Sequence, residues 1–251
     1  MAKSPVGVLL LHGLSSHINC IDPVVPRLQK LGIPYRMPVL RGHGTQPSDL
    51  IGVKWQDWVE DGQKALDDLL QECEKAIIVG LSMGGVVALN LTANNQSRVE
   101  GLVCIAPALK LKSKLSALAP LIALVQKTLV FKPDPLGYFD QEAAKTSLNY
   151  PEVPTSVVVE LIKFGKLTAR PEFLSRIKVP TLILQTSQDR TVDPSMAQHL
   201  HDNLGSADRR LIWFHRSGHE MLRDAQREEI LDEIEKFVAE IATKAQKGVS
   251  A

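Results

Sequence analysis

A single serine lies between glycines in the segment Gly80-Leu81-Ser82-Met83-Gly84-Gly85. The segment follows the apolar run Ala76–Val79 and precedes the apolar run Val86–Leu89, so the pattern predicts a strand, a sharp turn and a helix. At such a turn the serine is held in a strained conformation that exposes its hydroxyl above the sheet. The flanking glycines lack the Cβ atoms that would collide where strand and helix cross closely. We therefore predict that Ser82 is a nucleophile.

A serine hydroxyl is a weak nucleophile at neutral pH and requires an adjacent base. Histidine fits this role, and a carboxylate then fixes its tautomer and stabilises the imidazolium. Where the serine occupies a strand–turn–helix, the chain order is serine, acid, histidine, each on a loop that follows a strand. Two acids follow one predicted strand here, and two histidines come at the end of another or just beyond it: Asp189 and Asp193, and His215 and His219.

The positions of these residues in their loops distinguish between them. Asp189 lies early in its loop, whereas Asp193 directly precedes a proline and is typical of a helix N-cap. His219 follows a glycine within a loop, whereas His215 still belongs to the end of a strand. We predict that Asp189 is the acid and His219 the base, with Asp193 and His215 as the alternatives.

Acyl transfer also needs N–H donors for the developing oxyanion, each worth roughly 10²–10³ in rate. The backbone N–H of Met83 comes directly after the serine, and that of Leu14 lies in the loop after the first predicted strand. We predict these two groups as the oxyanion hole. His12 lies in the same loop, and we expect it to shape the loop through hydrogen bonds rather than to act as the base. His43, within Arg41-Gly42-His43-Gly44, is expected to be structural.

Buried strands and helices alternate along the chain. Six mostly apolar runs predict strands: Val6–Leu11, Tyr35–Val39, Ala76–Gly80, Val99–Ala106, Thr181–Gln185 and Arg210–His215. Helical patterns separate them: Cys20–Leu31, Trp55–Leu70, Val86–Ala93, Pro194–Leu204 and Met221–Ala245. Strands without polar alternation are covered on both faces, so the chain is predicted to be α/β, with a doubly wound, mainly parallel sheet of about six strands. All the candidate catalytic residues then follow the carboxyl ends of strands.

The alternation breaks between about Pro107 and Ile177, where no buried strand is predicted. Helical patterns at 111–131 and 155–168 predict a helical cap, residues 107–177, inserted between the fourth and fifth strands of a core formed by 1–106 and 178–251. Two plain crossover helices are the alternative. The cap would lie where open α/β sheets bind ligands. Apolar side chains expected to pack on the core or to line an acyl pocket are Leu118, Leu121, Ile122, Val125, Val158, Leu161, Ile162 and Phe164.

The bulk composition excludes several classes of protein. The 251 residues carry 29 Lys and Arg against 28 Asp and Glu, and a net charge of +1 argues against a nucleic-acid partner. Cys20, Cys73 and Cys104 form no C-x-x-C pair, and the glycine motifs do not resemble a dinucleotide fingerprint, so neither metal nor cofactor is expected. The first apolar run, Val6–Leu11, is too short for a signal peptide or membrane span. We expect a cytoplasmic protein without stable membrane insertion.

Five segments together resemble a known family: Leu9-Leu10-Leu11-His12-Gly13-Leu14, Arg41-Gly42-His43-Gly44, Trp55-Gln56-Asp57-Trp58, Gly80-Leu81-Ser82-Met83-Gly84-Gly85 and Ser217-Gly218-His219. The resemblance is to the bacterial carboxylesterases and monoacylglycerol lipases of the α/β-hydrolase superfamily. It implies a serine hydrolase that cleaves small, short- to medium-chain carboxylic esters with an apolar acyl chain. It also implies Ser82 as nucleophile, Asp189 as acid and His219 as base, with Leu14 and Met83 as the oxyanion hole.

The sequence departs from this family at two places. The first strand begins near residue 6, which implies a six-stranded core without the two leading strands common in the superfamily. The loop at 15–19 lacks the usual Gly-(Ser/Thr)-Pro run, and Glu152 is the candidate for the polar cap residue that holds glycerol in monoacylglycerol lipases. A monoacylglycerol lipase, a thioesterase, an aminopeptidase-like hydrolase and a non-catalytic small-molecule receptor are the alternatives. The sequence leaves the physiological substrate and the oligomeric state open.

Overall fold

Six parallel strands form the central sheet, in the order β2-β1-β3-β4-β7-β8. The computed structural model describes residues 3–15, 18–113, 118–130, 137–145, 147 and 149–249. The strands are β1 (Ser4–Leu11), β2 (Tyr35–Arg36), β3 (Cys73–Leu81), β4 (Val99–Ile105), β7 (Thr181–Thr186) and β8 (Arg209–Phe214). The prediction of a doubly wound, six-stranded parallel sheet is confirmed, although β2 is shorter than expected.

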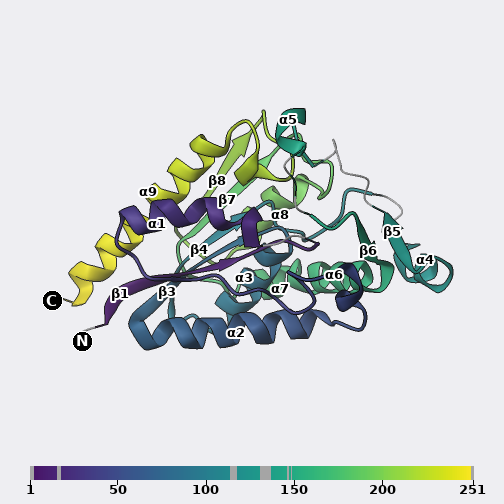
Figure 1. Cartoon of the computed structure of the whole chain (residues 1–251). Helices are drawn as coiled ribbons and strands as arrows, with labels where there is room; N and C mark the ends of the chain where they lie inside the picture. The colour runs from purple at the N-terminus through teal and green to yellow at the C-terminus, as the bar shows by residue number, and fades with distance from the viewer. Residues whose placement is uncertain are drawn as a thin grey trace.

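Helices cover both faces of this sheet, which explains why its central strands are apolar on both sides. They are α1 (Val25–Lys30), α2 (Trp55–Glu72), α3 (Met83–Asn94), α8 (Ser195–Asn203) and α9 (Arg227–Val249). Figure 1 shows α1 and α9 over one face and α2 and α3 over the other. The central strand β3 is enclosed on both faces, since its residues Ile77, Ile78 and Val79 are 0% exposed.

Short 3₁₀ helices occur where the sequence predicted longer α-helices. The predicted helix at 20–31 begins as two 3₁₀ turns, Ile18–Cys20 and Asp22–Val24, before α1. Prolines within this stretch lack the N–H that an α-helical bond would need. The predicted C-terminal helix likewise starts as the 3₁₀ turn Met221–Arg223, and α9 begins only at Arg227. A further 3₁₀ helix spans Pro47–Leu50.

The segment from 107 to 177 contains more than helices. Its described elements are α4 (Ala119–Val125), β5 (Thr128–Val130), α5 (Gln141–Ala144), β6 (Glu152–Pro154), α6 (Thr155–Thr168) and α7 (Pro171–Leu174). β5 and β6 pair in an antiparallel ladder, so the expectation of no strand here is wrong. The predicted helix at 111–131 is α-helical only in α4, and residues 114–117 and 131 lie outside the described ones. Three-residue strands are too short to leave a periodic pattern.

Figure 1 places α4, β5, β6 and α6 beyond the end of the sheet toward which the strand arrows point. The apolar side chains of the two main helices differ in their surroundings there. On α6, Val158, Leu161 and Phe164 are at most 5% exposed. Leu118, directly before α4, is 48% exposed, and Val125, the last residue of α4, is 86% exposed. Packing against the described part of the sheet domain therefore comes mainly from α6.

Candidate active site

Ser82 occupies the turn between β3 and α3 in a backbone conformation that L-residues rarely adopt, with φ +55° and ψ −115°. The close approach of the two elements enforces it: a Cβ on Gly80 would lie 2.2 Å from the carbonyl oxygen of Gly84. The Ser82 N–H donates to the Ile105 carbonyl of β4 at 2.9 Å, so the turn is also bonded to the sheet. Strain held in this way by surrounding structure is typical of functional sites.

The two residues predicted to supply the oxyanion donors come from segments that approach this serine. Met83 is the first residue of α3, and the first N–H groups of a helix have no partner within it. Leu14 follows Gly13. Gly13 lies close to the serine, since a Cβ on Gly13 would be 4.0 Å from Ser82 Oγ. The Gly13 N–H is already engaged, since it points at Cys20 Sγ at 3.4 Å. The loop after β1 and the start of α3 thus meet at the serine hydroxyl.

The three predicted catalytic side chains form one chain of hydrogen bonds. Ser82 Oγ lies 2.9 Å from His219 Nε2, and His219 Nδ1 lies 2.9 Å from Asp189 Oδ2. A carboxylate can only accept, so His219 carries its proton on Nδ1 and leaves Nε2 free to accept from the Ser82 hydroxyl. All three side chains are at most 8% exposed. The structure therefore brings together residues that are 137 and 30 positions apart in sequence.

Asp189 is held by four donors and none of its oxygen atoms faces solvent. Its Oδ1 accepts from the N–H groups of Thr191 and Val192, both at 2.9 Å, and its Oδ2 accepts from Gln185 Nε2 at 3.1 Å as well as from His219. Burial raises the pKa of this carboxyl, but the charge and hydrogen bond of His219 and the two amides outweigh burial and lower it. Asp189 thus stays ionised at neutral pH.

The contact between Asp189 and His219 also shifts the pKa of the imidazole, but upward. Burial lowers the pKa of His219, but the Asp189 carboxylate and the hydrogen bond to it raise the pKa above its ordinary value. The imidazolium that forms when His219 takes a proton is therefore stabilised by Asp189, which is what a general base in a serine hydrolase requires.

The two alternative residues lie in other contacts. Asp193 pairs with Lys110 Nζ at 2.8 Å and accepts from the N–H of Ser195 at the start of α8, as a helix-capping residue does. His215 Nδ1 lies 2.9 Å from Ser187 Oγ in an exposed pair. Neither has a hydrogen bond to Ser82 or to His219 within the described structure.

His12 and His43 connect the loops after β1 and β2. The His12 ring donates from Nδ1 to the Gly13 carbonyl at 2.9 Å and accepts at Nε2 from the Leu40 N–H at 3.0 Å. The His43 ring lies 4.8 Å from it, edge to face. Burial lowers the pKa of His43 to about 4, even though hydrogen bonds to two backbone carbonyls oppose this. His43 is therefore neutral at pH 7 and packs inside the loop.

Other candidate reactive groups are absent from the described parts of the chain or are inert. No group of three or more His, Cys, Asp or Glu side chains there could hold a metal ion. The three cysteines are free and buried. Burial raises the pKa of Cys73 to about 11 and raises that of Cys104 as well, so neither forms a thiolate at neutral pH. None of the described helices combines the length and the apolar character needed to cross a bilayer.

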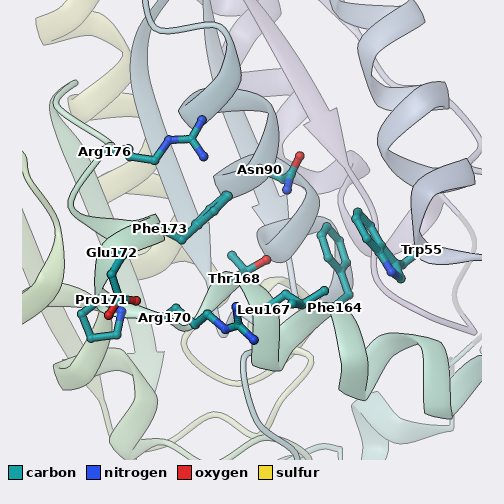
Figure 2. A pocket seen from close by; sticks show the side chains of 10 residues that line it. All are labelled: Trp55, Asn90, Phe164, Leu167, Thr168, Arg170, Pro171, Glu172, Phe173 and Arg176. Atoms are coloured by element: carbon teal, nitrogen blue, oxygen red, sulfur yellow. The ribbon is translucent and has the colours of Figure 1, made fainter.

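A wide hollow of about 870 Å³ lies apart from these residues. Figure 2 shows its lining, which comes from α2, α3, α6, α7 and the residues just before and after α7. Trp55 and Phe164 stack along one side, with ring centroids 4.8 Å apart. Ser82, Asp189 and His219 are not among its lining residues, so this hollow does not open on the serine.

Sequence reasoning missed two residues that support the site. Gln185, the last residue but one of β7, donates to Asp189, and Asp224 binds the backbone next to His219. A polar side chain at the end of the apolar strand Thr181–Gln185 was a usable signal for the first. No sequence signal pointed to the second, because two of its partners, the backbone amides of Phe139 and Asp140, lie 85 and 84 positions away in the chain.

Comparison with known proteins agrees with this architecture. Residues 3–226 match the family described as "Serine aminopeptidase, S33", and the chain belongs to this family of α/β-hydrolases. A solved structure from work on LipS and LipT, two metagenome-derived lipolytic enzymes, superposes with a TM-score of 0.86 at 26% identity over 95% of both chains. The monoacylglycerol lipase of Paleococcus ferrophilus, at 20% identity and 96% of both chains, gives a TM-score of 0.80 and shares the fold.

Two curated relatives cover nearly the whole chain. The thermostable monoacylglycerol lipase of Bacillus sp. (strain H-257) is 27% identical over 240 residues, which are 96% of this chain and 93% of the relative. The carboxylesterase of Bacillus subtilis (strain 168) is 22% identical over 93% of this chain and 92% of its own length. The predicted resemblance to bacterial carboxylesterases and monoacylglycerol lipases is confirmed.

Proposed function

We propose that the protein is a carboxylesterase that uses Ser82 as its nucleophile. The observation that carries this proposal is the hydrogen-bonded order Ser82 Oγ, His219 Nε2, His219 Nδ1, Asp189 Oδ2, with both separations at 2.9 Å. The lipase and esterase names of the relatives support ester bonds as the target.

The reaction follows from these positions. Ser82 Oγ attacks the ester carbonyl carbon while its proton passes to His219 Nε2, and the backbone N–H groups of Met83 and Leu14 receive the oxyanion. His219 then returns the proton to the leaving alcohol, which leaves an acyl group on Ser82. Water, deprotonated by His219, cleaves that acyl-enzyme and restores the serine. Asp189 keeps the imidazole in the required tautomer throughout.

We further propose that residues 107–177 form a cap on the core of 1–106 and 178–251. Bonds between this segment and the loops of the core support the assignment: the Tyr150 N–H donates to the Ser15 carbonyl at 2.7 Å, and the Thr45 N–H donates to Tyr150 Oη at 2.9 Å. Glu152, the candidate for holding a glycerol, lies exposed on β6.

An acyl chain would find an apolar space beside the nucleophile turn. A hollow of about 440 Å³ is lined mainly by apolar side chains of α6, α8 and the loop after β4, among them Leu111, Ile162 and Met196. Ser82, Asp189 and His219 do not line this hollow either, but it reaches the nucleophile turn through Ala108, whose N–H donates to the Ser82 carbonyl at 3.1 Å. We propose that this hollow takes the apolar part of a small ester substrate.

The test of this function is hydrolysis of para-nitrophenyl esters of graded chain length. Each buried CH₂ contributes about 0.8 kcal/mol, or about fourfold in kcat/KM. We expect kcat/KM to rise from acetate to about hexanoate or octanoate and then to fall when the hollow is full. Ile162→Ala should move the optimum to longer chains, whereas the control Val125→Ala, at an 86% exposed position, should not. A flat profile, or an acetate optimum in all three proteins, would exclude this acyl site.

Matched substrates separate the alternative functions in the same assay. Faster cleavage of a monoacylglycerol, of an acyl thioester or of an aminoacyl para-nitroanilide would identify a lipase, a thioesterase or an aminopeptidase respectively. A protein that binds octanoate but hydrolyses none of these compounds would be a receptor.

The pH dependence of kcat/KM follows from the pKa of His219. Only the neutral imidazole accepts the serine proton, so activity should rise with pH as His219 deprotonates. Asp189 raises that pKa. The pH at which kcat/KM is half-maximal should therefore lie above the ordinary pKa of histidine, where a free histidine is already neutral. Stopped-flow hydrolysis of one ester between pH 5 and 9 measures the midpoint. A rate independent of pH would contradict a histidine base.

A further inference from the structure

The carboxylate of Asp224 is buried among backbone amides rather than beside a cation. Only 3% of this residue is exposed, and no Lys, Arg or His side chain of the described residues forms an ion pair with it. Its Oδ2 accepts from the N–H groups of Gly218 and Phe139, both at 2.6 Å. Its Oδ1 accepts from those of Asp140 and Ala225, both at 2.8 Å. Such charge-assisted bonds are roughly twice as strong as neutral ones.

These amides belong to two different parts of the molecule. Gly218 directly precedes His219 on the loop after β8, whereas Phe139 and Asp140 lie 79 and 78 positions before Gly218, in the proposed cap. One carboxylate oxygen, Oδ2, therefore holds the His219 loop and the cap segment together.

Two more contacts join the same pair of segments. The Glu220 N–H, directly after His219, donates to the Gly137 carbonyl at 3.0 Å. Asn149 Nδ2 donates to Glu220 Oε1 at 2.9 Å. The loop also lies so close to the cap that a Cβ on Gly218 would be 2.4 Å from the Gly137 oxygen. His219 is thus flanked on both sides by residues bonded to the cap segment.

We propose that Asp224 is a positioning residue for the base, and that it fixes the His219 loop to the cap segment 137–140. The proposal rests on the ester hydrolysis proposed above. His219 must keep Nε2 within bonding distance of Ser82 Oγ, and a displacement of about 1 Å can cost 10²-fold in rate. The cap therefore does more than cover the substrate: its segment 137–140 aligns the general base, through Asp224.

Asp224→Asn tests this assignment with almost no change in shape. The amide keeps one acceptor oxygen but turns an NH₂ group toward two backbone N–H donors, so two of the four bonds are lost. We expect kcat for a para-nitrophenyl ester to fall about 10- to 100-fold, with KM within threefold. The midpoint of the pH profile should fall as well. The contact with Asp189 raises the pKa of His219, and a displaced His219 loses part of that contact.

The control is Asp57→Asn on α2, since Asp57 also accepts a backbone amide, that of Lys54 at 2.8 Å, but has no contact with the His219 loop in the described structure. It should change kcat less than twofold. If Asp224→Asn does not fold, Gly218→Ala tests the same contact, because its Cβ pushes the loop and the cap apart; it should lower kcat in the same way.

A folded Asp224→Asn protein whose circular dichroism, kcat and pH midpoint all match the wild type would overturn the proposal. So would a lower melting temperature with unchanged kcat and pH midpoint, which indicates a purely structural role. An inert wild type that a fluorophosphonate does not label is a different result, because it refutes the esterase function itself before any variant is compared.

Discussion

Replacing Ser82 with alanine is expected to lower kcat for ester hydrolysis on the order of 10⁶-fold, which leaves only the residual rate that binding of the substrate supplies. Its Oγ is the atom that His219 Nε2 contacts at 2.9 Å, and alanine has no group that could form the acyl-enzyme. The fold should survive, because the backbone bonds of the turn do not involve the hydroxyl: the Ser82 N–H still reaches Ile105 and its carbonyl still accepts from Ala108.

Two measurements check this result. A fluorophosphonate probe followed by peptide mass spectrometry should label the wild type at Ser82 and leave Ser82→Ala unlabelled. The matched control is Ser187→Ala, since Ser187 Oγ also lies 2.9 Å from a histidine nitrogen, that of His215, but in an exposed pair. This control should keep its activity within twofold. Label on another serine, or turnover retained by Ser82→Ala, would mean that the nucleophile lies elsewhere.

The sheet was predictable because its strands carry their signal locally. Runs such as Ala76–Gly80 are apolar throughout, and the alternation with helices implies parallel pairing. The limits of the elements were less predictable: β2 ends at Arg36, three residues before the end of the predicted run. The β5–β6 ladder could not be predicted, since each strand has three residues and is defined by its partner rather than by a pattern.

The candidate site was predictable where a local constraint acts on the chain. Ser82 stands at a turn that only flanking glycines permit, and this is visible in sequence. The preference for His219 over His215 as the candidate base rested only on the position of each residue relative to its strand, and the structure brings His219 to Ser82 and His215 to Ser187. Asp224 illustrates the opposite case, because its role depends on amides contributed by Gly218 and by the distant cap segment, and these acceptor–donor pairs appear only in three dimensions.

Asparagine in place of Asp189 should lower kcat by about 10⁴-fold. The surroundings of the side chain determine which way the new amide points. Oδ1 accepts from the N–H groups of Thr191 and Val192, so the amide oxygen must take that place. The NH₂ group then faces His219 Nδ1, which has to become the acceptor. The proton moves to Nε2, and His219 can no longer take the proton of Ser82.

The matched control for this change is Asp193→Asn, four residues further along the same loop. Asp193 binds Lys110 and the first turn of α8, and asparagine caps a helix about as well as aspartate. The substitution should therefore cost only the ion pair with the exposed Lys110, at most about 1 kcal/mol of stability. Its kcat should stay within threefold of the wild type, because Asp193 has no hydrogen bond to His219 in the described structure. Kinetics at pH 8 with a single para-nitrophenyl ester, after circular dichroism has shown that both variants are folded, compares them directly. If Asp193→Asn is the more damaging change, the acid of the site is Asp193, and the 2.9 Å contact between Asp189 and His219 serves the structure alone.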